Sequence, residues 1–201
     1  MIIMKNLFFL VFFFSLNSYS QNSFILKKDG TKIEISDKFT DFQVINIDKR
    51  ISYVVPGKTW EKYITYKDLD YASFGQYVFK SFKIKKKQKG YFVLADDVDK
   101  RLVCLVTAVT TKQGKSLYST ITYYDVLVLD LGDNIIETLY FKGTSKSADN
   151  VGLRKKVPEL IKRNFQNCPK VIERMESFNT NDEYFMDILG FFDSPVYLKC
   201  N

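Results

Sequence analysis

The stretch that decides the fold covers residues 102–124 and reads LVCLVTAVTTKQGKSLYSTITYY. Two runs rich in β-branched and aromatic residues, 102–111 and 117–124, flank the turn Lys112-Gln113-Gly114-Lys115. Such side chains favour strands, and a short turn containing glycine between two of these runs favours a hairpin. We therefore expect the longest antiparallel pair of the protein here.

Shorter hairpins of the same kind are expected elsewhere in the chain. Asp29-Gly30 lies between the runs 24–27 and 31–35. Because a type I′ turn needs positive φ angles, which Asp-Gly tolerates, this pair predicts a tight hairpin. Turns that recur among similar runs indicate an antiparallel β meander, either a curled sheet or a partial barrel. The further runs are 44–47, 51–55, 59–66, 77–84, 91–94, 126–131 and 135–141.

Apolar residues at helical spacing replace this pattern in the last quarter of the chain. This spacing predicts a helix over residues 150–165, in which Pro158 predicts a break or the start of a new helix. Pro169 suits the first turn of a second helix. Asn181-Asp182 would cap a third helix, which Gly190 would end.

These patterns together define the expected organisation. We expect an α+β fold, with antiparallel β structure over residues 21–144 followed by short helices over 145–201. Because the helices are short and amphipathic, we expect them to pack on the sheet within the same domain.

Residues 1–20, MIIMKNLFFLVFFFSLNSYS, predict where the protein goes. Lys5 precedes the apolar run 7–14, and Ser18-Tyr19-Ser20 places small residues where a signal peptidase reads them. The run is too short to span a bilayer core of about 30 Å. We expect a signal peptide cleaved before Gln21, with an uncleaved anchor as the alternative. The mature protein would be exported to the periplasm or the cell exterior and would not span a membrane.

The chain contains no histidine, and its formal net charge is +7. Without imidazole neither a Ser-His-Asp nor a Cys-His nucleophile system can be built, and metal sites lose their commonest nitrogen ligand. A carboxylate pair or a lysine base stays possible. We expect no cofactor and no bound metal, and the basic charge favours contact with anionic surfaces.

Three cysteines occur in the chain. Cys104 lies in the apolar run RLVCLVTAV and is expected to be a small buried hydrophobic residue. Cys168 and Cys200 lie in polar, turn-prone segments, and an oxidising compartment would let them pair. Two free thiols are the alternative.

The mature chain resembles a group of uncharacterised small exported proteins of flavobacteria and their relatives. The resemblance is carried by Lys28-Asp29-Gly30, Tyr66-Lys67-Asp68-Leu69, Asn167-Cys168-Pro169 and Tyr197-Leu198-Lys199-Cys200, behind a leader that ends before Gln21. It implies a β meander with a helical end, and it supports pairing of the two C-terminal cysteines. It implies no activity, substrate or catalytic residue.

The densest charge feature is a lysine-rich turn flanked by aromatic residues. Cations beside aromatic rings suit an anionic ligand such as an acidic glycan, whereas lysines at a sheet edge also prevent edge-to-edge association. We do not expect nucleic acid as a partner, because an exported protein rarely meets it. The candidate residues are Lys83, Lys85, Lys86, Lys87 and Lys89.

Aromatic residues are frequent, with 18 Phe, 13 Tyr and one Trp. Most would pack in the core, but an exposed face around Trp60, Tyr63 and Tyr66 would suit a sugar or a peptide. The acidic segment 96–99 lacks the spacing of a calcium-binding loop and is expected to be a polar loop. Asp68 and Asp70 are expected to serve turns and caps.

Three functions fit these features. The leading hypothesis is a non-enzymatic exported protein that binds an envelope protein or a glycan, and no catalytic residue is assigned. The second is a glycan hydrolase, which needs two carboxyl groups roughly 5 to 10 Å apart across a cleft. The third is a carrier that holds a small apolar ligand in a curled sheet.

Overall fold

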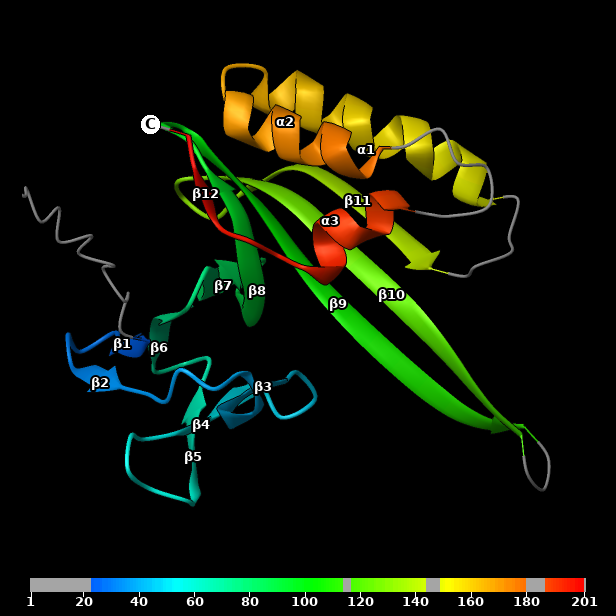
Figure 1. Ribbon diagram of the computed structural model, residues 1–201. Coiled ribbons are helices and arrows are strands. Elements are labelled where there is room, and N and C mark those ends of the chain that lie inside the picture. Colours follow the sequence, from blue (N-terminus) through cyan, green and yellow to red (C-terminus); the bar gives the residue numbers. More distant parts are fainter. Residues whose placement is uncertain (1–22, 114–116, 144–148, 180–186, 201) are drawn as a thin grey trace, which may run out of the picture.

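The computed structural model describes residues 23–113, 117–143, 149–179 and 187–200 (Figure 1). Antiparallel strands come first and short helices follow, so the predicted α+β class is confirmed. The predicted signal peptide and the predicted cap at Asn181-Asp182 lie outside the described residues. No helix in the described part of the chain is long and apolar enough to cross a membrane.

A nine-stranded sheet forms the body of the protein. Its strands are β1 (Phe24–Lys27), β2 (Lys32–Glu34), β6 (Leu69–Phe74), β7 (Tyr77–Ile84), β8 (Lys87–Asp96), β9 (Lys100–Gln113), β10 (Leu117–Asp130), β11 (Ile135–Gly143) and β12 (Leu198–Lys199). They lie in the order β11-β10-β9-β8-β7-β6-β1-β2, with β12 parallel to the end of β8. The sheet curls but does not close into a barrel.

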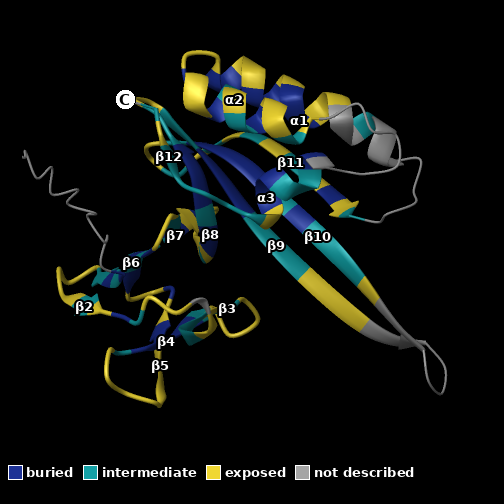
Figure 2. Cartoon of the chain, viewed as in Figure 1, coloured by how far each residue is buried: buried dark blue, intermediate teal, exposed yellow. Residues whose placement is uncertain are grey.

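The predicted long hairpin is confirmed as β9 and β10. Their register runs without a shift from Lys100 opposite Asp130 to Gln113 opposite Leu117. Burial falls along the hairpin, because its base packs in the core while its far half extends from the body of the protein (Figure 2).

The meander is interrupted between β2 and β6. Three strands, β3 (Phe42–Ile45), β4 (Arg50–Val54) and β5 (Glu61–Thr65), form a separate small sheet after a short 3₁₀ turn, η1 (Phe39–Asp41). Their buried side chains, such as Ile51, pack against the large sheet, and β1 pairs with β6 beyond them. The run that we expected as a single meander is therefore divided over two sheets.

The tight turns differ from the prediction in detail. The Asp29-Gly30 hairpin forms, but within that turn only Gly30 has a positive φ, 85°. Two positive φ angles, the signature of a type I′ turn, occur instead at Lys85 (48°) and Lys86 (66°), between Ile84 and its partner Lys87.

The helices cover one face of β8 to β11 (Figure 1). They are α1 (Asp149–Phe165), α2 (Pro169–Phe178) and α3 (Gly190–Asp193), the last preceded by the 3₁₀ turn η2 (Asp187–Leu189). Their buried residues, among them Val157, Ile161, Val171 and Met175, form the largest core cluster with the sheet.

Two helix predictions were wrong. Pro158 does not break α1, because Val157, Leu160 and Ile161 beside it are buried against the sheet and outweigh the lost backbone hydrogen bond. Gly190 begins α3 instead of ending a helix. A side chain there would lie 2.7 Å from the ring of Phe178, so the glycine permits a close approach of α2 and α3.

The predicted cysteine pairing is confirmed. Cys168, at the start of α2, is bonded to Cys200, and their Cα atoms lie 4.9 Å apart. The bond ties the last residues of the chain to the helical layer. Cys104 is free and buried, as expected.

Candidate functional site

The strands β6, β7 and β8 carry two different surfaces. Side chains alternate between the faces of a strand, and here one set is apolar while the other is largely polar. Residues Ala72, Phe74, Tyr77, Phe79 and Phe92 face one hollow, which we call the aromatic pocket. Residues Tyr71, Ser73, Val78, Lys80 and Val93 line another hollow, part of what we call the polar groove.

The aromatic pocket has a volume of about 270 Å³. Its rings pack in pairs: Phe42 stacks on Phe74 with ring centres 5.4 Å apart, and Phe79 meets Phe92 edge to face at 5.1 Å. These contacts hold the wall in one arrangement, as aromatic pairs of this geometry attract. The rest of the lining is Val44, Val106, Phe192, Asp193 and Pro195.

Asp193 is the one carboxylate that lines this pocket within the described chain. The Tyr124 hydroxyl donates a hydrogen bond of 2.8 Å to its Oδ1 atom. Burial raises the pKa of the Asp193 carboxyl above its ordinary value, although the hydrogen bond opposes this. The pocket thus offers a mainly apolar volume with one carboxylate on its described wall.

The predicted aromatic surface is only partly exposed. Trp60 and Tyr63 are 56% and 50% exposed, but Tyr66 is 1% exposed, so its assignment to this surface was wrong. Tyr66 is buried because Gly90 on β8 has no side chain: a Cβ atom there would lie 2.7 Å from Cζ of Tyr66. The tyrosine ring fills that space beside Phe79.

Trp60 and Tyr63 each carry a cation above the ring. Lys58 Nζ lies 5.1 Å from the Trp60 ring centre, and the Arg50 guanidinium lies 4.3 Å from that of Tyr63. Tyr63 also donates a hydrogen bond to Glu61 at 3.0 Å. These two rings belong to the small sheet and line neither the aromatic pocket nor the polar groove.

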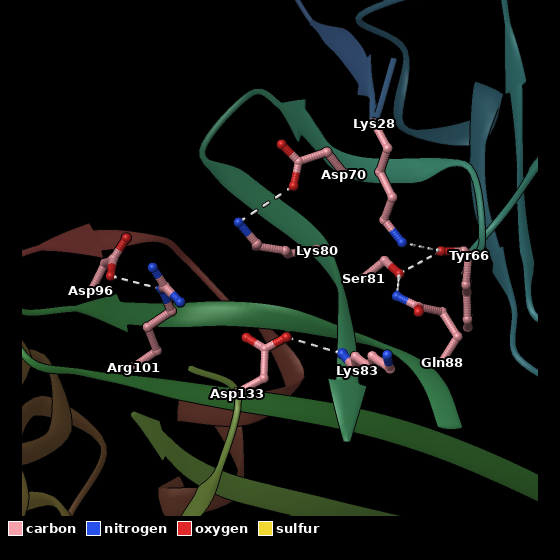
Figure 3. Close-up of polar contacts among 10 residues, drawn as sticks. All are labelled: Lys28, Tyr66, Asp70, Lys80, Ser81, Lys83, Gln88, Asp96, Arg101 and Asp133. Atoms are coloured by element: carbon pink, nitrogen blue, oxygen red, sulfur yellow. Dashed lines mark hydrogen bonds and ion pairs between the residues drawn. The ribbon is translucent and has the colours of Figure 1, made fainter. Parts of the chain in front are cut away.

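The polar groove consists of two adjoining hollows that share Lys80 and Arg101, with volumes of about 610 and 340 Å³. Figure 3 shows the polar contacts at its centre. The larger hollow is lined by Phe24, Tyr71, Ser73, Gly75, Gln76, Val78, Lys80, Val93, Asp96, Arg101, Tyr197 and Lys199. The smaller one is lined by Lys28, Asp70, Lys80, Ser81, Lys83, Gln88, Arg101, Leu131 and Asp133.

The carboxylates of the groove already have partners. Asp96 pairs with Arg101 at 3.1 Å, and Asp70 lies 3.5 Å from Lys80 (Figure 3). Asp70 reaches Lys80 where the register of β1 and β6 shifts by one residue, a bulge that redirects a side chain. Asp133, in the turn between β10 and β11, accepts a hydrogen bond of 3.0 Å from the backbone N–H of Lys83. This bond joins the turn to the end of β7 that extends beyond its pairing with β6.

A small hydrogen-bond network forms the floor of the smaller hollow. The Ser81 hydroxyl donates to the backbone carbonyl of Tyr66 at 2.5 Å and accepts a hydrogen bond from the Gln88 amide. The Lys28 ammonium donates to the same carbonyl at 3.4 Å (Figure 3). This network fixes Ser81 and Gln88 in place.

The five predicted lysines do not share one surface. Lys83 lines the groove, whereas Lys85 and Lys86 form the exposed hairpin tip beside it. Lys87 and Lys89 alternate with Gln88 on β8 and share the strand face of Val93, but they line neither hollow of the groove. Lys89 lies there 3.3 Å from the Tyr91 hydroxyl.

Sequence reasoning missed most cations of the groove. Lys28, Arg101 and Lys199 come from three distant segments, and no local spacing links them to Lys80 or Lys83. Only the pairing of the strands brings them together.

The acidic residues considered in the sequence analysis lie in turns and loops of the fold. Asp68 accepts a hydrogen bond of 2.8 Å from the Thr65 hydroxyl in the turn before β6. Asp97 and Asp99 flank Val98 in the exposed loop between β8 and β9. No cluster of potential metal ligands occurs among the residues that the structure describes.

Comparison with protein-family models, with curated proteins and with solved structures found no match to this chain.

Proposed function

We propose that this protein is exported and acts as a non-enzymatic binding protein that takes an apolar group in the aromatic pocket. The observation that carries the proposal is the pocket itself, with its phenyl rings held by their own packing. Small-molecule sites are typically apolar, with a few polar groups, and have volumes of roughly 300–1,000 Å³. At about 270 Å³, the pocket suits one ring or a short branched chain of a partner molecule.

The chemistry of the pocket favours binding over catalysis. A hydrolase of glycans needs two opposed carboxyl groups, and the described lining contains one, Asp193. This carboxyl accepts a hydrogen bond from Tyr124, and burial raises its pKa above the ordinary value. A group of this kind positions a hydroxyl or amine of a bound ligand.

Export is supported by the disulfide bond and by the N-terminal sequence. Disulfides persist in oxidising compartments, and Cys168–Cys200 is such a bond. Expression of the full chain in a Gram-negative host should release a periplasmic protein that begins at Gln21, as read by mass spectrometry. Recovery of the uncleaved chain in the cytoplasm would contradict export.

Binding in the pocket is tested with N-phenyl-1-naphthylamine, a neutral aromatic probe whose fluorescence rises in apolar surroundings. Ala72→Leu adds three carbon atoms to the pocket wall, and we expect it to weaken binding about 10-fold or more, equivalent to about 1.4 kcal/mol. Ala108→Leu is the matched control, because Ala108 is exposed on β9 and does not line the pocket.

The outcome is decisive if both variants fold, as judged by circular dichroism and thermal unfolding. Should Ala72→Leu be unstable, Val44→Trp narrows the pocket from the half-buried strand β3 instead. Probe affinity equal to that of the unmodified protein in a folded pocket variant would overturn the proposal.

A further inference from the structure

The polar groove is elongated. Its two hollows share Lys80 and Arg101, so they adjoin. The larger hollow lies on the face of β6 to β8 opposite the aromatic pocket, and the smaller one reaches around the edge of β7 beyond its pairing with β6, to Ser81, Lys83 and Gln88. A depression made of two joined hollows accommodates several units of a linear ligand better than one compact molecule.

The groove has an excess of cations. Five basic residues line it, against the three carboxylates Asp70, Asp96 and Asp133. Lys80 and Arg101 are paired with two of these carboxylates. Lys28, Lys83 and Lys199 make no ion pair with any residue in the described ranges, but the Lys28 ammonium donates to the Tyr66 carbonyl. Among the described residues, Lys83 and Lys199 therefore have ammonium groups with no polar partner, and both side chains are exposed.

The two unpaired cations lie in different hollows. Lys199 lines only the larger hollow and Lys83 only the smaller one. They suit a ligand with acidic groups spaced along its length, in contrast to a ligand with one concentrated charge.

The remaining lining suits sugar rings. Tyr71 and Phe24 meet edge to face at 5.6 Å in the larger hollow, and Tyr197 lines it as well. The C–H face of a pyranose ring packs on such aromatic rings. Hydroxyl and amide side chains that exchange hydrogen bonds with sugar hydroxyls also line the groove: Ser73, Gln76, Ser81 and Gln88.

We propose that the polar groove binds a linear acidic polysaccharide, a polyuronate or a sulfated glycan. Its acidic groups contact Lys83 and Lys199, and its rings lie against Tyr71 and Tyr197. The carboxylates within the groove favour a saccharide over single-stranded DNA, because every sugar unit carries hydroxyls that donate hydrogen bonds to them, whereas the units within a DNA strand carry none.

The test measures binding of a hexameric oligogalacturonate by calorimetry, at low and at moderate salt. Loss of two charge contacts in Lys83→Gln/Lys199→Gln should weaken binding about 10-fold or more and reduce its salt dependence. The matched control is Lys155→Gln/Lys156→Gln, which removes the same charge from the exposed face of α1 and should retain the original affinity. Tyr71→Ala should weaken binding without altering the salt dependence.

Further ligands separate the alternatives. Binding of a sulfated glycan hexamer shows whether the groove prefers sulfates to carboxylates. A cellulose hexamer measures the affinity for an uncharged saccharide, and a 12-nucleotide oligothymidylate measures the affinity for nucleic acid. Equal binding of the neutral hexamer, tighter binding of oligothymidylate, or equal losses in the two double-lysine variants would overturn the proposal. Because Ala72 lines the pocket and neither hollow of the groove, Ala72→Leu should leave oligogalacturonate binding intact, so either proposal can fail alone.

Discussion

The aromatic pocket and the larger hollow of the polar groove lie on opposite faces of the same three strands. On β7, Tyr77 and Phe79 face the pocket, while Val78 and Lys80 face the groove. Because successive side chains of a strand point to opposite sides of the sheet, the same strands present an apolar surface on one side and a polar surface on the other. What each face binds then depends on the segments that cover its ends.

One segment, residues 194–200, supports both faces, and we call it the C-terminal strap. Pro195 lines the pocket, whereas Tyr197 and Lys199 line the groove. The backbone N–H of Tyr197 donates to the backbone carbonyl of Gln76 at 2.9 Å, and that of Cys200 donates to the backbone carbonyl of Asp96 at 3.1 Å. The Cys168–Cys200 bond holds the end of the strap.

The largest expected effect comes from removing that bond. Cys168→Ala/Cys200→Ala releases a cross-link over 32 residues, which by chain entropy should cost about 3–4 kcal/mol. Because the strap borders both sites, we expect both probe and oligogalacturonate to bind more weakly. Denaturant unfolding and the two titrations measure this against the disulfide-bonded unmodified protein, and the reduced unmodified protein, which also lacks the cross-link, should behave like the variant. Loss of binding on one face alone would show that the strap does not couple the two sites.

The next effect should be confined to the pocket face. Gly90→Ala drives a methyl group into Tyr66 and Phe79, both buried, and should cost about 2–3 kcal/mol as an overpacked core does. Probe binding should fall, since Phe79 lines the pocket. Gly152→Ala in α1 is the control: it has open space and should add up to about 1 kcal/mol of stability. Unfolding curves in which the two changes have equal effect would exclude overpacking as the cause.

A smaller gain is expected at the tip of the β7–β8 hairpin. Lys85 and Lys86 occupy left-handed conformations that cost non-glycine residues roughly 1–2 kcal/mol each. Lys85→Asn/Lys86→Gly supplies the preferred type I′ pair and should stabilise the fold by about 1 kcal/mol. Thermal unfolding checks the gain. Unchanged oligogalacturonate affinity would place the tip lysines outside the site, whereas a loss would extend the site to the tip.

The smallest effect should appear in the pH dependence of stability. Because the folded pKa of Asp193 is raised, its ionisation is less favourable in the folded state than in the unfolded state. The protein should therefore lose stability from this residue as the pH rises from the unfolded pKa through the folded one. Asp193→Asn keeps an acceptor for Tyr124 and removes this loss. The difference in unfolding free energy between the two proteins, measured from pH 3 to pH 7, should favour the variant increasingly; a constant difference would contradict the assignment.

The fold was largely predictable because its signals are local. The hairpin at 102–124 and the switch from strands to helices follow from residue type and spacing, and both are confirmed. The errors at Pro158 and Gly190 share one cause. Packing of buried neighbours against the sheet and against Phe178 overrode local propensity there.

The sites were predictable only in part. Trp60 and Tyr63 are exposed as hypothesised, and Lys83 lines a groove, but Tyr66 is buried. The burial of Tyr66 depends on Gly90, which is 24 positions away in the numbering and adjacent only through the sheet. No pattern within a single segment carries that information.

By itself, the sequence determined the order of strands and helices along the chain and which residues alternate along each strand. Those properties depend on the intrinsic preferences of neighbouring residues and on the 2.0 and 3.6 periods of strands and helices. Only the tertiary structure decided which alternating face became the aromatic pocket and which the polar groove. That choice depends on long-range contacts: the small sheet supplies Phe42, α3 ends at Asp193, and the strap carries Lys199 to the side of Lys80.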